Sequence, residues 1–171
     1  MIIMKLLYLI VFASFFTGVT AQEISVSAKL LTVYQLVSQE DYQKALSEIE
    51  EILEVDSSDY NAFIFGGICH KNLESCDSAL YFFDKAIEIK PKQADPYYLK
   101  AECSFNLREF EEALKLIDKT LYYDNNFHKA RILKAKVKHE QGDFLSAEKI
   151  LLQVMNEQLY NLESRKLMAD I

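Results

Sequence analysis

Four alanine residues recur at a constant interval of 34 residues: Ala45, Ala79, Ala113 and Ala147. Three residues before each alanine stand Tyr42, Cys76, Phe110 and Phe144, and four residues after it stand Ile49, Phe83, Ile117 and Leu151. Because large apolar neighbours recur in step with the alanines, the pattern is an internal repeat. A period of 34 residues predicts a solenoid built from pairs of helices.

Each period contains two stretches with apolar residues at i, i+3, i+4 and i+7, which predicts two amphipathic helices. A second row of small residues lies on the first of these helices, at Gly67, Ala101 and Ala135, with Val33 in the first unit. Helix axes that cross at about 8–10 Å leave room only for small side chains at the contact. We therefore expect both rows to be buried where helices cross.

The second unit carries Phe63, Gly67, Ala79, Phe83, Ala86 and Pro91 at the offsets of the tetratricopeptide repeat pattern. The chain resembles that family over residues 24–169. The resemblance implies an all-α fold, a right-handed α-solenoid of antiparallel helix pairs. It places four repeats within residues 22–159, at about 26–59, 60–93, 94–127 and 128–159, followed by a capping helix at 160–171. Asp95 is expected to cap one helix, with Pro96 at its first position.

Residues 1–21 lie outside the repeat. A single basic residue, Lys5, precedes an apolar run at residues 6–16, and small residues end the segment at Ala21. This pattern predicts a signal peptide cleaved near Ala21, and hence export to a periplasm or the cell exterior. An uncleaved anchor is the alternative, although the run is short for a membrane span.

Composition and motifs exclude several classes of function. The net charge is −7, with acidic and basic residues interleaved on the helices, which is typical of solvated surfaces and not of nucleic-acid binding. Residues 129–138 are the densest basic stretch, which forms either a solvated face or a patch for a partner. The four glycines form no phosphate loop, and the histidines at 70, 128 and 139 lack metal-ligand spacing. We therefore expect no catalytic residue, no metal and no cofactor.

The three cysteines leave two interpretations open. Cys69, Cys76 and Cys103 are small enough to fill buried repeat positions as free thiols, which is the interpretation we favour. In an exported protein a Cys69–Cys76 or Cys76–Cys103 disulfide is the alternative.

The family resemblance implies that the first helices line a concave groove. It maps the groove onto these residues: Tyr34, Ile64, Ile68, Lys71, Tyr98, Glu102, Phe105, Ile132 and Lys136. Exposed apolar patches usually mark interaction sites, so we expect a peptide or partner protein to bind there, unless curvature buries these side chains against one another. Tyr34 and Ile68 stand where the family's chaperone-tail clamp needs polar residues, which disfavours that ligand.

The sequence thus predicts a non-catalytic scaffold for protein–protein interaction, with a peptide or protein as its partner. The alternative is a structural subunit of an oligomer or envelope-associated complex that uses the same apolar face. Both interpretations predict that the mature chain has no membrane span.

Overall fold

The computed structural model describes residues 21–156, and their side chains from Val26 onward. This part of the chain forms eight α-helices and no strand, which confirms the all-α prediction. The helices are α2 (Ala21–Ser38), α3 (Tyr42–Val55), α4 (Tyr60–Asn72), α5 (Cys76–Ile89), α6 (Ala94–Asn106), α7 (Phe110–Tyr123), α8 (His128–Glu140) and α9 (Phe144–Asn156). The predicted capping helix at 160–171 and, apart from Ala21, the predicted signal peptide lie outside the described residues.

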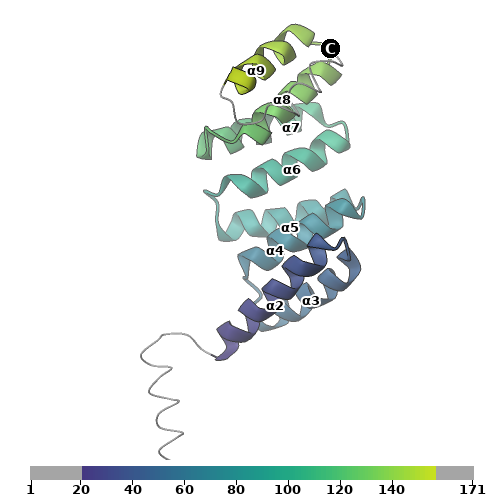
Figure 1. Ribbon diagram of the computed structural model, residues 1–171, viewed down its shortest axis with the longest axis vertical. Helices are drawn as coiled ribbons and strands as arrows, with labels where there is room; N and C mark the ends of the chain where they lie inside the picture. The colour runs from purple at the N-terminus through teal and green to yellow at the C-terminus, as the bar shows by residue number, and fades with distance from the viewer. Residues whose placement is uncertain (1–20, 157–171) are drawn as a thin grey trace, which may run out of the picture.

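The helices form antiparallel pairs that stack along the long axis of the molecule (Figure 1). Within a pair, α2 packs on α3, α4 on α5, α6 on α7 and α8 on α9. Successive first helices also contact each other, α2 with α4, α4 with α6 and α6 with α8, whereas no contact of comparable extent joins successive second helices among the described residues. The stack is therefore an α-solenoid with its first helices on the inner side of the curve.

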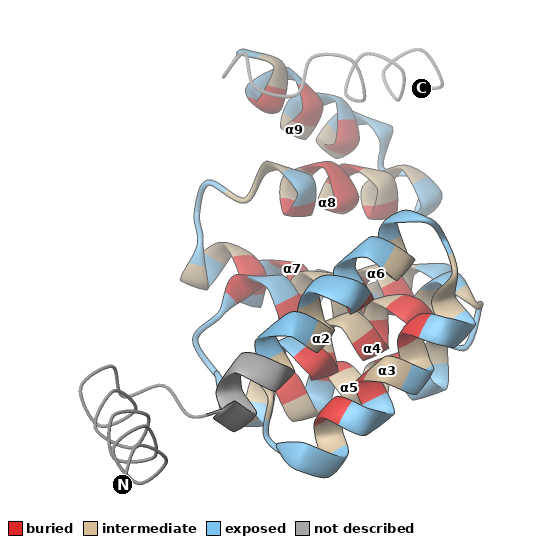
Figure 2. Ribbon diagram, turned by 60° about the horizontal axis from the view of Figure 1, so that its bottom comes forward, coloured by how far each residue is buried: buried red, intermediate tan, exposed pale blue. Residues whose placement is uncertain are grey.

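The two rows of small residues form the tightest part of the interior. All four alanines of the 34-residue row have no exposed surface, and neither have Val33, Ala101 and Ala135. In Figure 2 buried segments form stripes along the sides of the helices that face one another. The predicted burial of both rows is confirmed.

Side-chain volumes compensate one another at the equivalent crossings. The second unit places its smallest residue, Gly67, against its largest, Phe83. The fourth unit pairs Ala135 with Leu151 in one buried cluster. Interiors pack at nearly crystalline density, so a gain in volume on one helix requires a loss on its partner.

The turns inside the pairs share one backbone conformation. Glu40, Glu74 and Arg108 have φ values of 62°, 59° and 62°, and Gly142 has a φ of 79°. These four residues are again spaced by 34. The left-handed conformation ends each first helix and reverses the chain, but only the last unit fills the position with glycine, the residue that adopts it without strain.

The connections between pairs differ in how they begin the next helix. Asp59 caps α4, because its side chain accepts a hydrogen bond from Ala62 N at 2.7 Å. The predicted cap at Asp95 is wrong: α6 begins at Ala94, so Asp95 lies within its first turn and Gln93 occupies the cap position. No helix in residues 21–156 has the length and hydrophobicity needed to cross a membrane.

Candidate functional site

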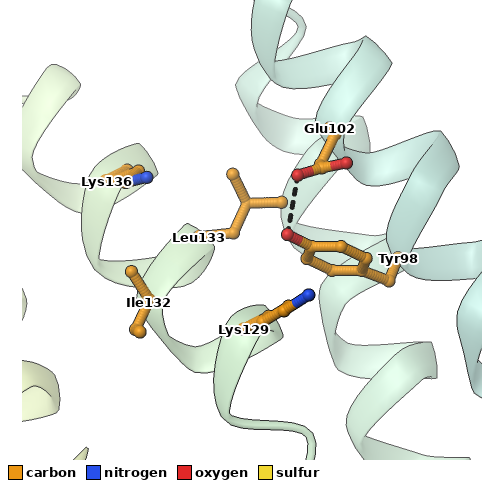
Figure 3. A pocket seen from close by; sticks show the side chains of 6 residues that line it. All are labelled: Tyr98, Glu102, Lys129, Ile132, Leu133 and Lys136. Atoms are coloured by element: carbon orange, nitrogen blue, oxygen red, sulfur yellow. Dashed lines mark hydrogen bonds between the residues drawn. The ribbon is translucent and has the colours of Figure 1, made fainter. Parts of the chain in front are cut away.

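A pocket of about 260 Å³ opens between α6 and α8, on the inner side of the solenoid. It is lined by Tyr98, Glu102, Lys129, Ile132, Leu133 and Lys136 (Figure 3). The pocket joins two first helices from successive units, so stacking brings together residues some 30 positions apart in the sequence. Four of the nine predicted groove residues lie in its wall.

Glu102 is the centre of a hydrogen-bond network beside the pocket. One carboxylate oxygen, Oε1, accepts a hydrogen bond from the Tyr98 hydroxyl at 2.6 Å, and Oε2 accepts one from Lys71 Nζ at 2.5 Å. Lys71 lies on α4, so the ion pair links α4 to α6. The Tyr98 ring packs on Phe127, with ring centroids 5.0 Å apart. These contacts fix the carboxylate and the ring on one wall.

The opposite wall carries two lysines. Figure 3 shows the side chains of Lys129 and Lys136 directed toward the wall that holds Tyr98 and Glu102. No ion pair joins Lys129 to another described residue, while Lys136 and Tyr98 each make a further interaction. With Lys71, three ammonium groups surround a single carboxylate, so the pocket is positively charged in a chain whose net charge is −7.

The structure divides the basic stretch at residues 129–138 into two sets. Lys134 pairs with Asp118 at 2.6 Å and Lys138 with Asp143 at 3.9 Å, so these two lysines are neutralised on the flanks of α8. Lys129 and Lys136 instead line the pocket. The stretch is therefore neither a single solvated face nor a single basic patch.

The remaining predicted groove residues lie along the same inner helices. Tyr34 on α2 is 59% exposed, and its ring meets Phe65 edge-on with centroids 6.4 Å apart. Ile64 and Ile68 on α4 are half-buried. Phe105 on α6 is also half-buried and packs against Phe110, 6.1 Å away. Apolar surface therefore remains accessible on α2 and α4, while Phe105 is partly consumed by packing.

The predicted exposure of Ile132 is wrong. Its side chain is only 1% exposed, so it forms the floor of the pocket and not a free anchor. The prediction failed because the next helix axis lies close enough to cover this position. The sequence reasoning also missed Leu133 in the wall and Phe127 behind Tyr98. Phe127 follows a turn, where no helical periodicity marks it.

The histidines take packing roles. His70 lies against Phe82 and His139 against Phe144, with ring centroids 5.1 Å and 5.2 Å apart. Burial lowers the pKa of His70, and the charge of Glu50 opposes that shift. Among residues 21–156, no three His, Cys, Asp or Glu side chains are grouped so that they could hold a metal ion.

Stacked helix pairs with a lined inner groove define an α-solenoid of the tetratricopeptide type. The family model described as "Anaphase-promoting complex, cyclosome, subunit 3" matches the chain twice, at residues 38–120 and 72–154. The two matches are offset by one 34-residue period and together span more than half of the chain. The chain therefore belongs to this family of tetratricopeptide-like repeats, whose printed name describes another protein's assembly.

Similarity to individual proteins is confined to the repeat. The chain is 32% identical to Tetratricopeptide repeat protein 37 of Xenopus laevis over 68 residues, which are 40% of this chain and only 4% of that protein. The solved structure of MamA protein has a TM-score of 0.71 at 12% identity, covering 84% of this chain and 78% of that one. YrrB, described as a TPR protein with an unusual peptide-binding site, has a TM-score of 0.66 at 18% identity, covering 85% and 78%.

Proposed function

We propose that this chain is a non-catalytic interaction scaffold that holds an extended segment of a partner protein in its inner groove. In this proposal an acidic side chain of the partner enters the pocket between α6 and α8. The observation that carries the proposal is the set of three lysines around one carboxylate, on the inner side of a solenoid. Tetratricopeptide-like repeats serve mainly as scaffolds for protein interaction, which supports the general assignment.

The charge of the pocket favours a carboxylate. Lys71 already neutralises Glu102, so the ammonium groups of Lys129 and Lys136 determine the local potential. A cleft with one sign of charge concentrates ligands of the opposite sign, and low-dielectric walls such as Ile132 and Leu133 strengthen the effect. An aspartate or glutamate side chain could therefore receive hydrogen bonds from both lysines.

The volume of the pocket favours a side chain over a cofactor. Sites for whole small molecules usually measure about 300–1,000 Å³. A pocket of about 260 Å³ falls below that range and suits one residue of a bound peptide.

The apolar part of the groove would hold the rest of the segment. Tyr34 is 59% exposed on α2, and Ile64 and Ile68 are accessible on α4. Rigid aromatic side chains make efficient anchors because they lose little conformational entropy on binding. A ligand that places an apolar residue on α2 or α4 and an acid between α6 and α8 would cross the whole inner face.

Selection of peptides from a random library on the full chain tests the proposal. We expect selected peptides to share an aspartate or glutamate and nearby apolar residues. Lys129→Ala should weaken their binding by roughly tenfold. Lys134→Ala is the matched control, because Lys134 lies on the same helix but pairs with Asp118 outside the pocket. Equal losses for both variants would contradict a specific role for the pocket.

The same proteins separate the scaffold from a structural subunit. Light scattering should show a monomer whose mass is unchanged by Lys129→Ala and Tyr34→Ala. A stable oligomer that dissociates on Tyr34→Ala would instead mean that a second copy occupies the groove.

We further propose that the chain is exported and loses residues 1–21. The support is the sequence pattern of one lysine, an apolar run and small residues before the predicted cleavage point. The amino-terminal sequence of the protein from its source cell tests this directly. A first residue of Gln22 would support it, and an intact Met1 on cytosolic protein would overturn it.

A further inference from the structure

Two of the three cysteines meet across the joint between the second and third helix pairs. Cys76 is the first residue of α5, and Cys103 lies in the last turn of α6. Because α5 and α6 run antiparallel, the start of one lies beside the end of the other. Both residues pack into one cluster with Ala79 and Phe83. Cys69 belongs to a different cluster, with Val33 and Ala45.

The equivalent positions at the other two joints provide an internal comparison. Shifting Cys76 and Cys103 by 34 residues gives Tyr42 with Cys69 at the first joint, and Phe110 with Val137 at the third. Each of these pairs shares a buried cluster, so the two positions pack together at every joint. At the outer joints an aromatic ring covers a smaller side chain. Only at the middle joint does a thiol face another thiol.

The two thiols at this joint are in direct contact. A side-chain hydrogen bond joins Cys76 and Cys103, and both are free cysteines. Cys103 has no exposed surface, whereas Cys76 is half-buried. Burial raises the pKa of the Cys103 thiol to about 12, and proximity to Cys76 raises it further. Cys103 is thus protonated and shielded, and Cys76 is the sulfur that a reagent can reach.

We propose that Cys76 and Cys103 form a redox-active dithiol, which a disulfide-bearing oxidant converts into a disulfide between α5 and α6. The Cys76 thiolate attacks one sulfur of the oxidant and expels the first thiolate, leaving a mixed disulfide on Cys76. The Cys103 sulfur then attacks Sγ of Cys76 and expels the second thiolate. Two electrons pass to the oxidant, and the two expelled thiolates take up the protons that the cysteines lose.

The cross-link would fasten the second helix pair to the third. It closes a loop from residue 76 to residue 103, which lowers the conformational entropy of the unfolded chain. For a chain of this size the resulting stabilisation corresponds to a rise of roughly 5–10 °C in Tm. Because Cys103 is adjacent to Glu102, the bond would also restrain the wall of the pocket. The proposal depends neither on the peptide ligand nor on export.

Oxidised glutathione, a low-molecular-weight disulfide, provides the test on the full reduced chain. After treatment, free thiols are alkylated in denaturant and the protein is mapped by mass spectrometry. We expect Cys69 alone to be alkylated, a Cys76–Cys103 peptide pair to appear, and Tm to rise relative to the reduced protein. Cys69→Ala should retain this rise, and Cys76→Ser should lose it.

A second variant keeps the test decisive if Cys76→Ser perturbs folding. Cys103→Ala removes only the resolving sulfur, so Cys76 should remain joined to glutathione and no internal disulfide should form. The proposal is overturned if three thiols are alkylated in the treated wild type. A disulfide that contains Cys69, or one that joins two chains through Cys76, would equally overturn it.

Discussion

Gly67 lies directly against the ring of Phe83: a Cβ atom built at Gly67 would come within 2.3 Å of Phe83 Cε1. The two residues occupy the crossing of α4 and α5, where the other units pair a larger small residue with a smaller large one. The second crossing is thus a local exchange of volume between helices. The missing side chain on α4 makes room for the ring on α5.

This relationship predicts that Gly67→Ala destabilises the protein although alanine is the better helix former. Overpacking of this kind costs about 1–3 kcal/mol. In Phe83→Leu the same alanine should cost much less, because the ring is gone. Urea unfolding of the four proteins of the double-mutant cycle measures the coupling. Additive free energies of unfolding would show that the ring moves aside freely.

The left-handed turn residues predict two substitutions of opposite sign. Glu74→Gly should stabilise the protein by about 0.5–1 kcal/mol, because φ at Glu74 is 59° and glycine adopts this conformation without strain. Gly142→Ala should destabilise by about 1 kcal/mol, and that cost must come from the backbone, because a Cβ there meets no atom within 4 Å. Thermal unfolding of both variants measures the effects. Equal signs would refute the assignment.

His70 predicts a pH dependence of stability. Burial holds the pKa of His70 below its ordinary value in the folded protein, so the folded state binds fewer protons than the unfolded state. The contribution of His70 is therefore complete above a pH of about 6.5 and is lost as the pH falls below it. Urea unfolding from pH 7.5 to 5.5 should show a decline in stability that is shallower in His70→Gln. Parallel profiles for the two proteins would contradict this.

The helices and the interior were predictable from sequence because they depend on spacing within one unit. Ala79, Ala113 and Phe83 announce the repeat by their period, and the same period places them at crossings. The turn conformation at Glu40 and Glu74 was not predictable. Neither residue type favours a positive φ, and only Gly142 signals the position that all four turns share.

The pocket was predictable only in part, because it depends on how successive units stack. Tyr98 and Lys136 were assigned to the groove by repeat position alone. The curvature of the stack decides whether a side chain at such a position is free, as Tyr34 is, or covered, as Ile132 is. The ion pair between Lys71 and Glu102 spans two units. No periodicity within one unit indicates it.

The central claim is that the pocket between α6 and α8 receives an acidic side chain. Its most direct test is a double-mutant cycle between Lys129→Ala and replacement of the acid in a library-selected peptide by its amide. Fluorescence anisotropy gives the four Kd values. We predict a coupling free energy of about 1 kcal/mol or more, as close charge pairs at an interface show. Independent effects, with coupling near zero, would place the acid elsewhere and contradict the claim.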